Sequence, residues 1–327
     1  MDSRDPILAV EHLRTHFLTK AGVAKAVDDV SFTLAKGEVM GLVGESGSGK
    51  SVTGYSIIGL VDPPGEVVGG QVRFDGEDLL RASETRMRKL RGNRIAMIFQ
   101  DAMMTLNPVL RIDTQMIEAV RMHEKIGRRA AYERARDALG RVGIAAPDER
   151  MKAYPHQFSG GMRQRVCIAI ALINRPALII ADEPTTALDV TIQGQILHEV
   201  QKLCRETGTA LIWITHDLSV VAGLADRICV MYSGRIVEAG STDDVLDRPV
   251  HPYTRGLIGS IPSHNERGRR LAQIPGMAPA LLHLPAGCAF RPRCTIAGDA
   301  CRRAPGVSEP IPGRLIRCFH PQEGGGP

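Results

Sequence analysis

The segment from Gly44 to Ser51 constrains this chain more than any other, because its glycines and lysine have the spacing of a phosphate-binding loop. It fits the pattern of Gly, four residues, then Gly-Lys-Ser. The apolar run Val39–Val43 before it predicts a buried strand, and Val52–Leu60 after it can start a helix. A strand, a loop and a helix in this order point backbone N–H groups and the positive helix end at an anion. An α/β fold with a phosphate cradle follows.

The loop predicts a site for a nucleoside triphosphate and Mg²⁺. We expect Lys50 to reach the outer phosphates and the Ser51 hydroxyl to ligate Mg²⁺. A Gly/Ser-rich loop that matches by chance is the alternative, and the flanking strand and helix argue against it. The predicted ATP-binding residues of this segment are Gly44, Glu45, Ser46, Gly47, Ser48, Gly49, Lys50, Ser51 and Val52.

The length and hydropathy of the chain favour one large domain with a smaller one. The chain has 327 residues, of which 43% are hydrophobic, enough for a substantial core. No apolar run approaches the roughly 20 residues that span a membrane. Met1–Asp5 lacks the basic and then apolar pattern of a signal peptide. We therefore expect a cytosolic protein that contacts a membrane only through partners.

Positive charge is concentrated in the C-terminal part of the chain. The net charge is +5, yet residues 246–327 contain eleven Arg, no Lys and five acidic residues, so the preceding residues are almost neutral. A nucleic-acid-binding protein would spread basic residues over a folded face, so we expect no nucleic-acid partner. The same segment has twelve of the twenty Pro and four of the seven Cys. These changes in charge and in Pro and Cys content predict two domains, residues 1–245 and 246–327.

Two further strand patterns end in polar residues. The apolar run Ala177–Ala181 leads into Asp182 and Glu183, and ligand sites of α/β proteins lie at the carboxyl ends of such strands. Asp182 is expected to hold the Mg²⁺ shell through water, and Glu183 to polarise a water for attack on the γ-phosphate. A second apolar run ends at His216, which is placed to contact the γ-phosphate and hold that water. The alternative for each is a strand end with a solvated loop.

A second oxyanion cradle is predicted at Ser159-Gly160-Gly161, just before the apolar helix pattern Val166–Leu172. An ordinary helix-entry loop is the alternative. Both cradles can be used if two chains meet head to tail. The Ser159-Gly160-Gly161 cradle of one chain would then complete the nucleotide site at the phosphate-binding loop of the other.

These motifs, in this order, resemble the ATP-binding subunits of ABC transporters over residues 7 to about 245. Gln100 follows the strand pattern Ile95–Phe99, and Asp189 follows the paired carboxylates, as in that family. Ser159-Gly160-Gly161 corresponds to the signature motif of the family. The next residue is Met162, where most of the family has Gln, although Met is common in the peptide-importing branch. The resemblance implies a P-loop NTPase core of α/β class with an antiparallel β subdomain, a helical subdomain at about 102–165, and a small Pro/Cys-rich C-terminal domain.

The resemblance also implies roles for individual residues. Mg²⁺ would be held by Ser51, Gln100 and Asp182, and an aromatic side chain, here Phe17, would stack on the adenine. The residues of one chain that would contact ATP bound to the other are Ser159, Gly160, Gly161 and Asp189. The residues implied in catalysis are Glu183, His216, Lys50 and Gln100.

A narrower resemblance is to the dipeptide, oligopeptide and nickel import subfamily. It rests on Asp101–Pro108, Tyr154–Gln157, Thr185–Thr191 and His251–Thr254. It implies a peripheral ATPase at the cytoplasmic face of the inner membrane, paired with a second, homologous ATPase. Two transmembrane permeases and an extracytoplasmic solute-binding protein would complete an importer of di- or oligopeptides. Nickel or glutathione import, a soluble ABC ATPase and a metal-cluster sensor are the alternatives.

Four cysteines of the C-terminal segment have the spacing of a metal-cluster site. Cys288, Cys294, Cys301 and Cys318 have gaps of five, six and sixteen residues, without the close pair that is typical of zinc. Arginines next to them are expected to favour thiolates. Similar tails in the peptide-importing branch carry a [4Fe-4S] cluster, which the resemblance implies here; zinc and four free thiols are the alternatives.

Overall fold

The computed structural model describes residues 6–186, 188–261 and 273–322, and the chain forms two compact units. One unit is built mainly from Arg81–Trp213. The other combines Leu8–Leu34, Val39–Leu80 and Ile214–Pro327. The phosphate-binding loop therefore shares a unit with the C-terminal region, and the domain boundary near residue 245 stays a prediction.

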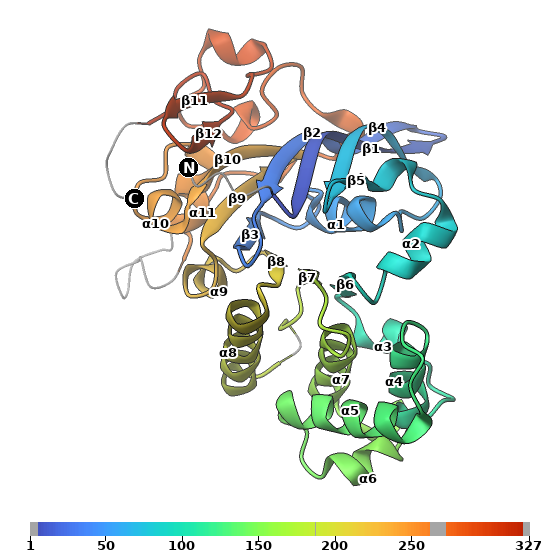
Figure 1. Ribbon diagram of the computed structural model, residues 1–327. Helices are drawn as coiled ribbons and strands as arrows, with labels where there is room; N and C mark the ends of the chain where they lie inside the picture. The colour runs from blue at the N-terminus through green and yellow to red at the C-terminus, as the bar shows by residue number, and fades with distance from the viewer. Residues whose placement is uncertain (1–5, 187, 262–272, 323–327) are drawn as a thin grey trace. The chain divides into compact units, whose positions relative to one another are not determined.

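The unit that contains the phosphate-binding loop begins with an antiparallel sheet in the order β2-β1-β4-β5 (Figure 1). Helix α1 (Lys50–Ile58) contacts it, and the buried hydroxyl oxygens of Thr15 in β1 and Ser56 in α1 lie 2.7 Å apart. This sheet confirms the predicted antiparallel subdomain. Its strands are β1 (Leu8–Thr19), β2 (Gly22–Leu34), β4 (Gly65–Phe74) and β5 (Glu77–Asp78).

A second group of strands in this unit joins the core to the C-terminal region. Strand β3 pairs in parallel with β9, while β9–β10, β10–β12 and β11–β12 are antiparallel. All five residues of β3 are buried, as its apolar sequence predicts. The C-terminal chain therefore extends the same sheet that carries the phosphate-binding loop. The strands are β3 (Val39–Val43), β9 (Arg227–Tyr232), β10 (Arg235–Ser241), β11 (Ser308–Ile311) and β12 (Arg314–Ile316).

The other unit contains parallel strands and a group of helices. Strands β6 (Ile95–Ile98) and β7 (Leu178–Asp182) pair in parallel. Strand β8 (Ala210–Thr215) follows β7 in the sheet, and the boundary between the two units falls within it. The predicted helical region, residues 102–165, contains helices α3 to α6 and the start of α7, while its bounds as a subdomain stay a prediction. The helices of this unit are α2 (Glu84–Leu90), α3 (Ala102–Thr105), α4 (Ile112–Arg121), α5 (Arg128–Arg141), α6 (Pro147–Met151), α7 (Gly160–Leu172) and α8 (Val190–Thr207).

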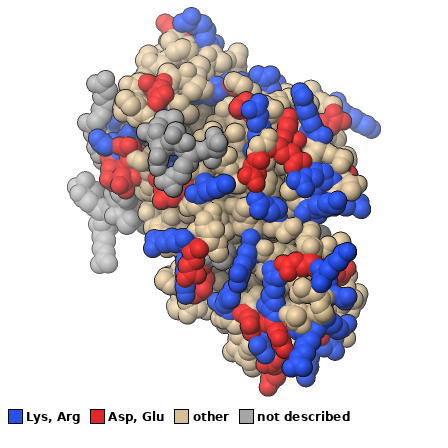
Figure 2. Space-filling model, in the orientation of Figure 1, with Lys and Arg blue, Asp and Glu red and all other residues tan. Residues whose placement is uncertain are grey.

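Helix α5 shows how an arginine-rich sequence forms a packed helix. Ala131, Ala135 and Leu139 recur every four residues and are buried, which gives the helix one apolar stripe. Its arginines occupy the remaining surface, and Arg129 forms an exposed ion pair with Glu133 one turn on. Figure 2 shows positive and negative side chains interspersed over this helical region. The face in view therefore offers no continuous basic patch there.

The C-terminal region has short elements, as its proline content predicts. Within the described part of the chain, every helix is too short or too polar to cross a membrane. Helix α9 (Leu218–Ala222) precedes this region and α10 (Thr242–Asp247) leads into it. Within the region are α11 (Pro252–Gly259) and single 3-10 turns at Leu281–His283, Arg291–Arg293 and Asp299–Arg302.

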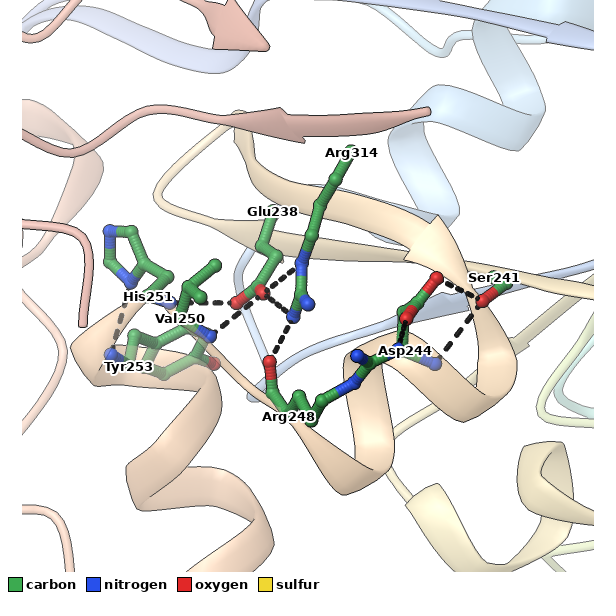
Figure 3. A network of polar contacts seen from close by, with 8 residues as sticks. All are labelled: Glu238, Ser241, Asp244, Arg248, Val250, His251, Tyr253 and Arg314. Carbon is green, nitrogen blue, oxygen red and sulfur yellow. Dashed lines mark hydrogen bonds and ion pairs between the residues drawn. The ribbon is translucent and has the colours of Figure 1, made fainter. Parts of the chain in front are cut away.

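A buried ion pair fastens the C-terminal strands to the core (Figure 3). Glu238 of β10 is 0% exposed, and one of its carboxylate oxygens lies 2.5 Å from a guanidinium nitrogen of Arg314 in β12. Glu238 also accepts hydrogen bonds from the N–H groups of Val250 and His251, and Arg314 donates to the carbonyl of Arg248. Because both charges have several partners, their removal from water is compensated.

His251, the N-cap residue of α11, makes the free energy of unfolding depend on pH. The His251 ring is buried, and its Nδ1 accepts a hydrogen bond from the Tyr253 N–H at 3.0 Å. Burial lowers the pKa of His251 from 6.5 to about 4, so the fold favours the neutral ring. The stabilisation is complete above pH 6.5 and is lost as the pH falls towards 4. We expect this group to remove about 3 kcal/mol of unfolding free energy across that window.

Replacing His251 by Asn tests this expectation, because Asn also caps a helix but does not titrate. Denaturant unfolding at several pH values should give a flatter profile for His251→Asn than for the wild type. Equal slopes between pH 6.5 and 4 would show that His251 does not carry the effect.

Candidate active site

The phosphate-binding loop connects β3 to α1, and hydrogen bonds from Lys50 link its end to its first residues. Lys50 is the first residue of α1 and is 5% exposed. Its ammonium group donates to the carbonyls of Gly44 and Glu45 at 2.7 and 3.0 Å. These contacts hold a positive charge at the mouth of the loop, where the outer phosphates of a nucleotide would need it. Ser51 and Val52 follow in the first turn of the helix.

Two glycines of the loop leave no room for a side chain. Gly44 has a φ of 153°, and a Cβ there would lie 2.2 Å from the Met231 carbonyl oxygen. Gly49 has a φ of 102°, and a Cβ there would lie 2.1 Å from the Ala26 carbonyl oxygen. The loop therefore lies directly against the backbones of β9 and β2. This close approach explains why glycine is required at both positions.

The same loop is held by hydrogen bonds from neighbouring segments. The Gly234 N–H, between β9 and β10, donates to the Ser48 carbonyl at 2.8 Å. The Glu45 N–H donates to the Tyr253 hydroxyl of α11, also at 2.8 Å. No sequence pattern assigned Tyr253 to the loop, although the segment His251–Thr254 carried part of the family resemblance. The C-terminal region thus contributes directly to the phosphate-binding loop.

Phe17 lies in β1, the strand that contacts the helix of the loop. The ring is half-buried, and it lies over Gly65 of β4, where an added Cβ would be 2.8 Å from the ring. Two residues earlier, Thr15 contacts Ser56 of α1. Stacking of Phe17 on adenine stays a prediction.

Gln100 and Glu183 lie together in the other unit. The parallel pairing of β6 with β7 aligns Ile98 with Ala181, so the residues that follow both strands emerge side by side. Gln100 Nε2 lies 3.4 Å from Glu183 Oε2, and the Thr186 hydroxyl donates to the same oxygen at 3.2 Å. The sequence predicted Gln100 and Glu183 as catalytic residues but gave no sign of Thr186.

The two predicted carboxylates differ in their surroundings. Asp182 ends β7 and is 0% exposed, whereas Glu183 begins the loop after it. Glu183 has a φ of 45°, a left-handed conformation that costs a non-glycine residue on the order of 1 kcal/mol or more. Such strain is often found at functional sites. Here it turns the chain so that Asp182 stays in the sheet while Glu183 meets Gln100.

The signature residues form an exposed helix N-terminus. The Ser159 hydroxyl caps α7 by accepting the Met162 N–H at 3.3 Å, and Ser159 and Gly160 are exposed. Asp189 caps α8 in the same way, through the Ile192 N–H at 3.0 Å. His216, in the unit that contains the phosphate-binding loop, is exposed after β8. Contacts of these residues with ATP stay predictions.

The four C-terminal cysteines surround one small cavity. Cys288, Cys294, Cys301 and Cys318 all line it, and the Cys288 N–H donates to the Cys301 carbonyl at 3.0 Å. Within the described ranges, no three His, Cys, Asp or Glu side chains are close enough to share one metal ion. A metal or cluster at these cysteines therefore stays a prediction.

The expectation that arginines favour thiolates here is wrong. Burial raises the pKa values of Cys288 and Cys294, and raises that of Cys318 to about 11. The physical reason is burial, which disfavours the charged thiolate, and two of the arginines pair with carboxylates instead. Arg293 pairs with Glu45 and Arg317 with Asp29.

The chain matches two family models. Residues 27–186 match the ABC transporter family, and residues 237–301 match the oligopeptide/dipeptide transporter C-terminal region. The chain belongs to the ATP-binding subunits of ABC transporters. It is an ATPase by this membership, with ATP as substrate and Mg²⁺ as the expected cofactor.

Two relatives that align over nearly the whole chain are peptide-transport ATP-binding proteins. The oligopeptide transport ATP-binding protein OppD of Escherichia coli is 48% identical over 98% of this chain and 94% of its own. The dipeptide transport ATP-binding protein DppD of Bacillus subtilis is 48% identical over 96% of this chain and 92% of its own. A solved dimer of the ATP-binding cassette MJ0796, bound to ADP and phosphate, aligns with a TM-score of 0.67 and 26% identity. That alignment covers 72% of this chain and 98% of the other.

Proposed function

We propose that this chain supplies the energy for the import of di- or oligopeptides through an ABC transporter. The match of its C-terminal region to that of oligopeptide/dipeptide transporters supports the cargo class. Its partners would be two transmembrane permeases, a second and homologous ATPase, and an extracytoplasmic peptide-binding protein. The chain would sit at the cytoplasmic face of the inner membrane, held there by the permeases.

The contact between Gln100 and Glu183 carries the hydrolytic part of the proposal. Glu183 acts as the general base that aligns water for in-line attack on the γ-phosphate, and Gln100 links its position to the helical subdomain. Lys50 and the loop N–H groups bind the phosphates, while Phe17 stacks on the adenine. Ser51, Gln100 and Asp182 would hold Mg²⁺, which neutralises charge on the phosphates. His216 holds the attacking water.

ATP binding would close two subunits on each other. Ser159, Gly160, Gly161 and Asp189 of one subunit then complete the site of the other, where the exposed α7 N-terminus faces the γ-phosphate. The dimer of the related cassette MJ0796 supports this mode. Closure moves the permeases, and hydrolysis releases the two subunits.

The four cysteines would hold a [4Fe-4S] cluster. Their sequence spacing lacks the close pair that is typical of zinc, and all four line one small cavity. Both observations support a group held by four thiolates. The cluster would fasten a segment that has too little core to fold alone.

The complete complex, with both ATPases, both permeases and the binding protein, tests the proposal. ATPase activity in lipid vesicles should rise when the binding protein carries di- or oligopeptides. Stimulation only by nickel or glutathione would change the cargo, and activity indifferent to the permeases would overturn an importer role. Iron and sulfide analysis of the same sample tests the cluster; zinc alone would contradict it.

A further inference from the structure

The phosphate-binding loop carries a carboxylate, which has the wrong sign for an anion site. Glu45 is the second residue of the loop, and its side chain is about one-third exposed. At the short distances within such a loop, an uncompensated negative charge would repel the phosphates of ATP. The loop therefore needs a positive group that neutralises Glu45 without occupying the phosphate site.

Arg293 of the C-terminal region is that group. Its two terminal nitrogens donate to the two carboxylate oxygens of Glu45 at 2.6 and 2.9 Å, over a sequence separation of 248 residues. The Arg293 side chain is 4% exposed. A bidentate pair of this kind is strong and fixes the orientation of both planar groups.

Further contacts fix Arg293 itself. Its Nε donates to the Pro275 carbonyl at 2.8 Å, and its guanidinium carbon lies 5.9 Å from the ring centroids of both Tyr232 and Phe290. The ion pair with Glu45 is the main cause that raises the pKa of Arg293 further above its usual value. The backbone beside it continues into Cys294, which lines the cysteine cavity.

We propose that Arg293 is a positioning residue for ATP binding, which neutralises Glu45 and orients the phosphate-binding loop from the C-terminal region. The Glu45 N–H is held by the Tyr253 hydroxyl of the same region, so both the side chain and the backbone of Glu45 are fixed from there. The proposal rests on ATP binding by this chain and not on the identity of the cargo.

The test measures the dissociation constant of MgATP by calorimetry on the full chain, with KM and kcat from ATP hydrolysis. Arg293→Gln should weaken MgATP binding about tenfold or more, because it exposes the loop to an unpaired carboxylate. KM for ATP should rise by a similar factor, with a smaller change in kcat. Arg293→Lys keeps the charge but cannot donate two parallel hydrogen bonds to the carboxylate. Its MgATP affinity should therefore lie between those of the wild type and Arg293→Gln.

A double variant distinguishes neutralisation of the Glu45 charge from a general packing role of the Arg293 side chain. In the double variant Glu45→Gln/Arg293→Gln the repelling charge is gone, so MgATP affinity should return towards the wild-type value. Arg302→Gln is the matched control, because the Arg302 side chain is 77% exposed and pairs with the exposed Asp299 in the same segment. Its affinity should not change.

The outcomes are distinct. Unchanged affinity in Arg293→Gln overturns the proposal, and so does an equal loss in Arg302→Gln. Weakened affinity that the double variant fails to recover assigns Arg293 a purely structural role and also overturns it. Circular dichroism of each variant establishes that it is folded. Because no permease or peptide is used, these results stand apart from the test of import.

Discussion

Replacing Glu183 by Gln should lower ATP turnover by about 10²–10⁴-fold while MgATP still binds, because a general base typically contributes that much. Gln has the same shape and can still accept the hydrogen bond from Thr186, so the loop after β7 should keep its conformation. What it loses is the ability to take a proton from water. Turnover is measured as phosphate release by the assembled complex, and binding by calorimetry on the same sample.

Glu133→Gln is the matched control for this replacement. Glu133 is a glutamate of the same unit, about half exposed, and its partner Arg129 is 93% exposed. Surface pairs of this kind contribute little to stability, so turnover should be unchanged. Normal turnover in Glu183→Gln would reject the general-base role, and loss of MgATP binding would point to a different one.

Replacing Arg314 by Met should lower the free energy of unfolding by about 3–5 kcal/mol, because it leaves Glu238 buried without its counter-ion. Glu238 is 0% and Arg314 3% exposed, so water does not replace the lost partner. The second replacement Glu238→Gln should recover part of this loss, because it removes the unpaired charge. Its one side-chain oxygen can still accept one of the N–H groups of Val250 and His251, which bond to different oxygens of Glu238. Denaturant unfolding of the full chain measures both.

Arg248→Gln serves as the control in the same network. The Arg248 backbone carbonyl accepts a hydrogen bond from Arg314, but the Arg248 side chain is 68% exposed and pairs with Asp244 one turn away. The replacement should change the unfolding free energy by less than about 1 kcal/mol. A loss in Arg314→Met no larger than this would show that the buried pair does not hold the C-terminal strands.

Local patterns were sufficient to predict the parts of the site that follow from chain order. The apolar run before Glu183 predicted a buried strand, and the resemblance supplied the strand before Gln100. Their parallel pairing places the residues after them side by side. The glycine spacing predicted the phosphate-binding loop, because Gly44 and Gly49 are required by close backbone contact. The resemblance supplied the antiparallel and helical subdomains.

The sequence could not predict which distant charges would meet. Arg293 follows a proline and precedes a cysteine, and this context suggested a role beside a cluster. Instead its partner is Glu45, 248 residues away, and Arg317 likewise pairs with Asp29. Pairing over such separations depends on how β12 and α11 pack on the core, which no local pattern encodes. The raised thiol pKa values follow from the same unforeseen packing.

The pairing of β12 with β10 sets the order in which this molecule can mature during synthesis. The ribosome releases the chain from its N-terminus at roughly 5–20 residues per second, so β10 emerges long before its neighbour. Until Arg314 leaves the exit tunnel, Glu238 has no counter-ion and one edge of β10 stays bare, a surface prone to association with other chains. A premature stop codon just before Arg314 would therefore produce an aggregation-prone polypeptide rather than a shortened but working ATPase.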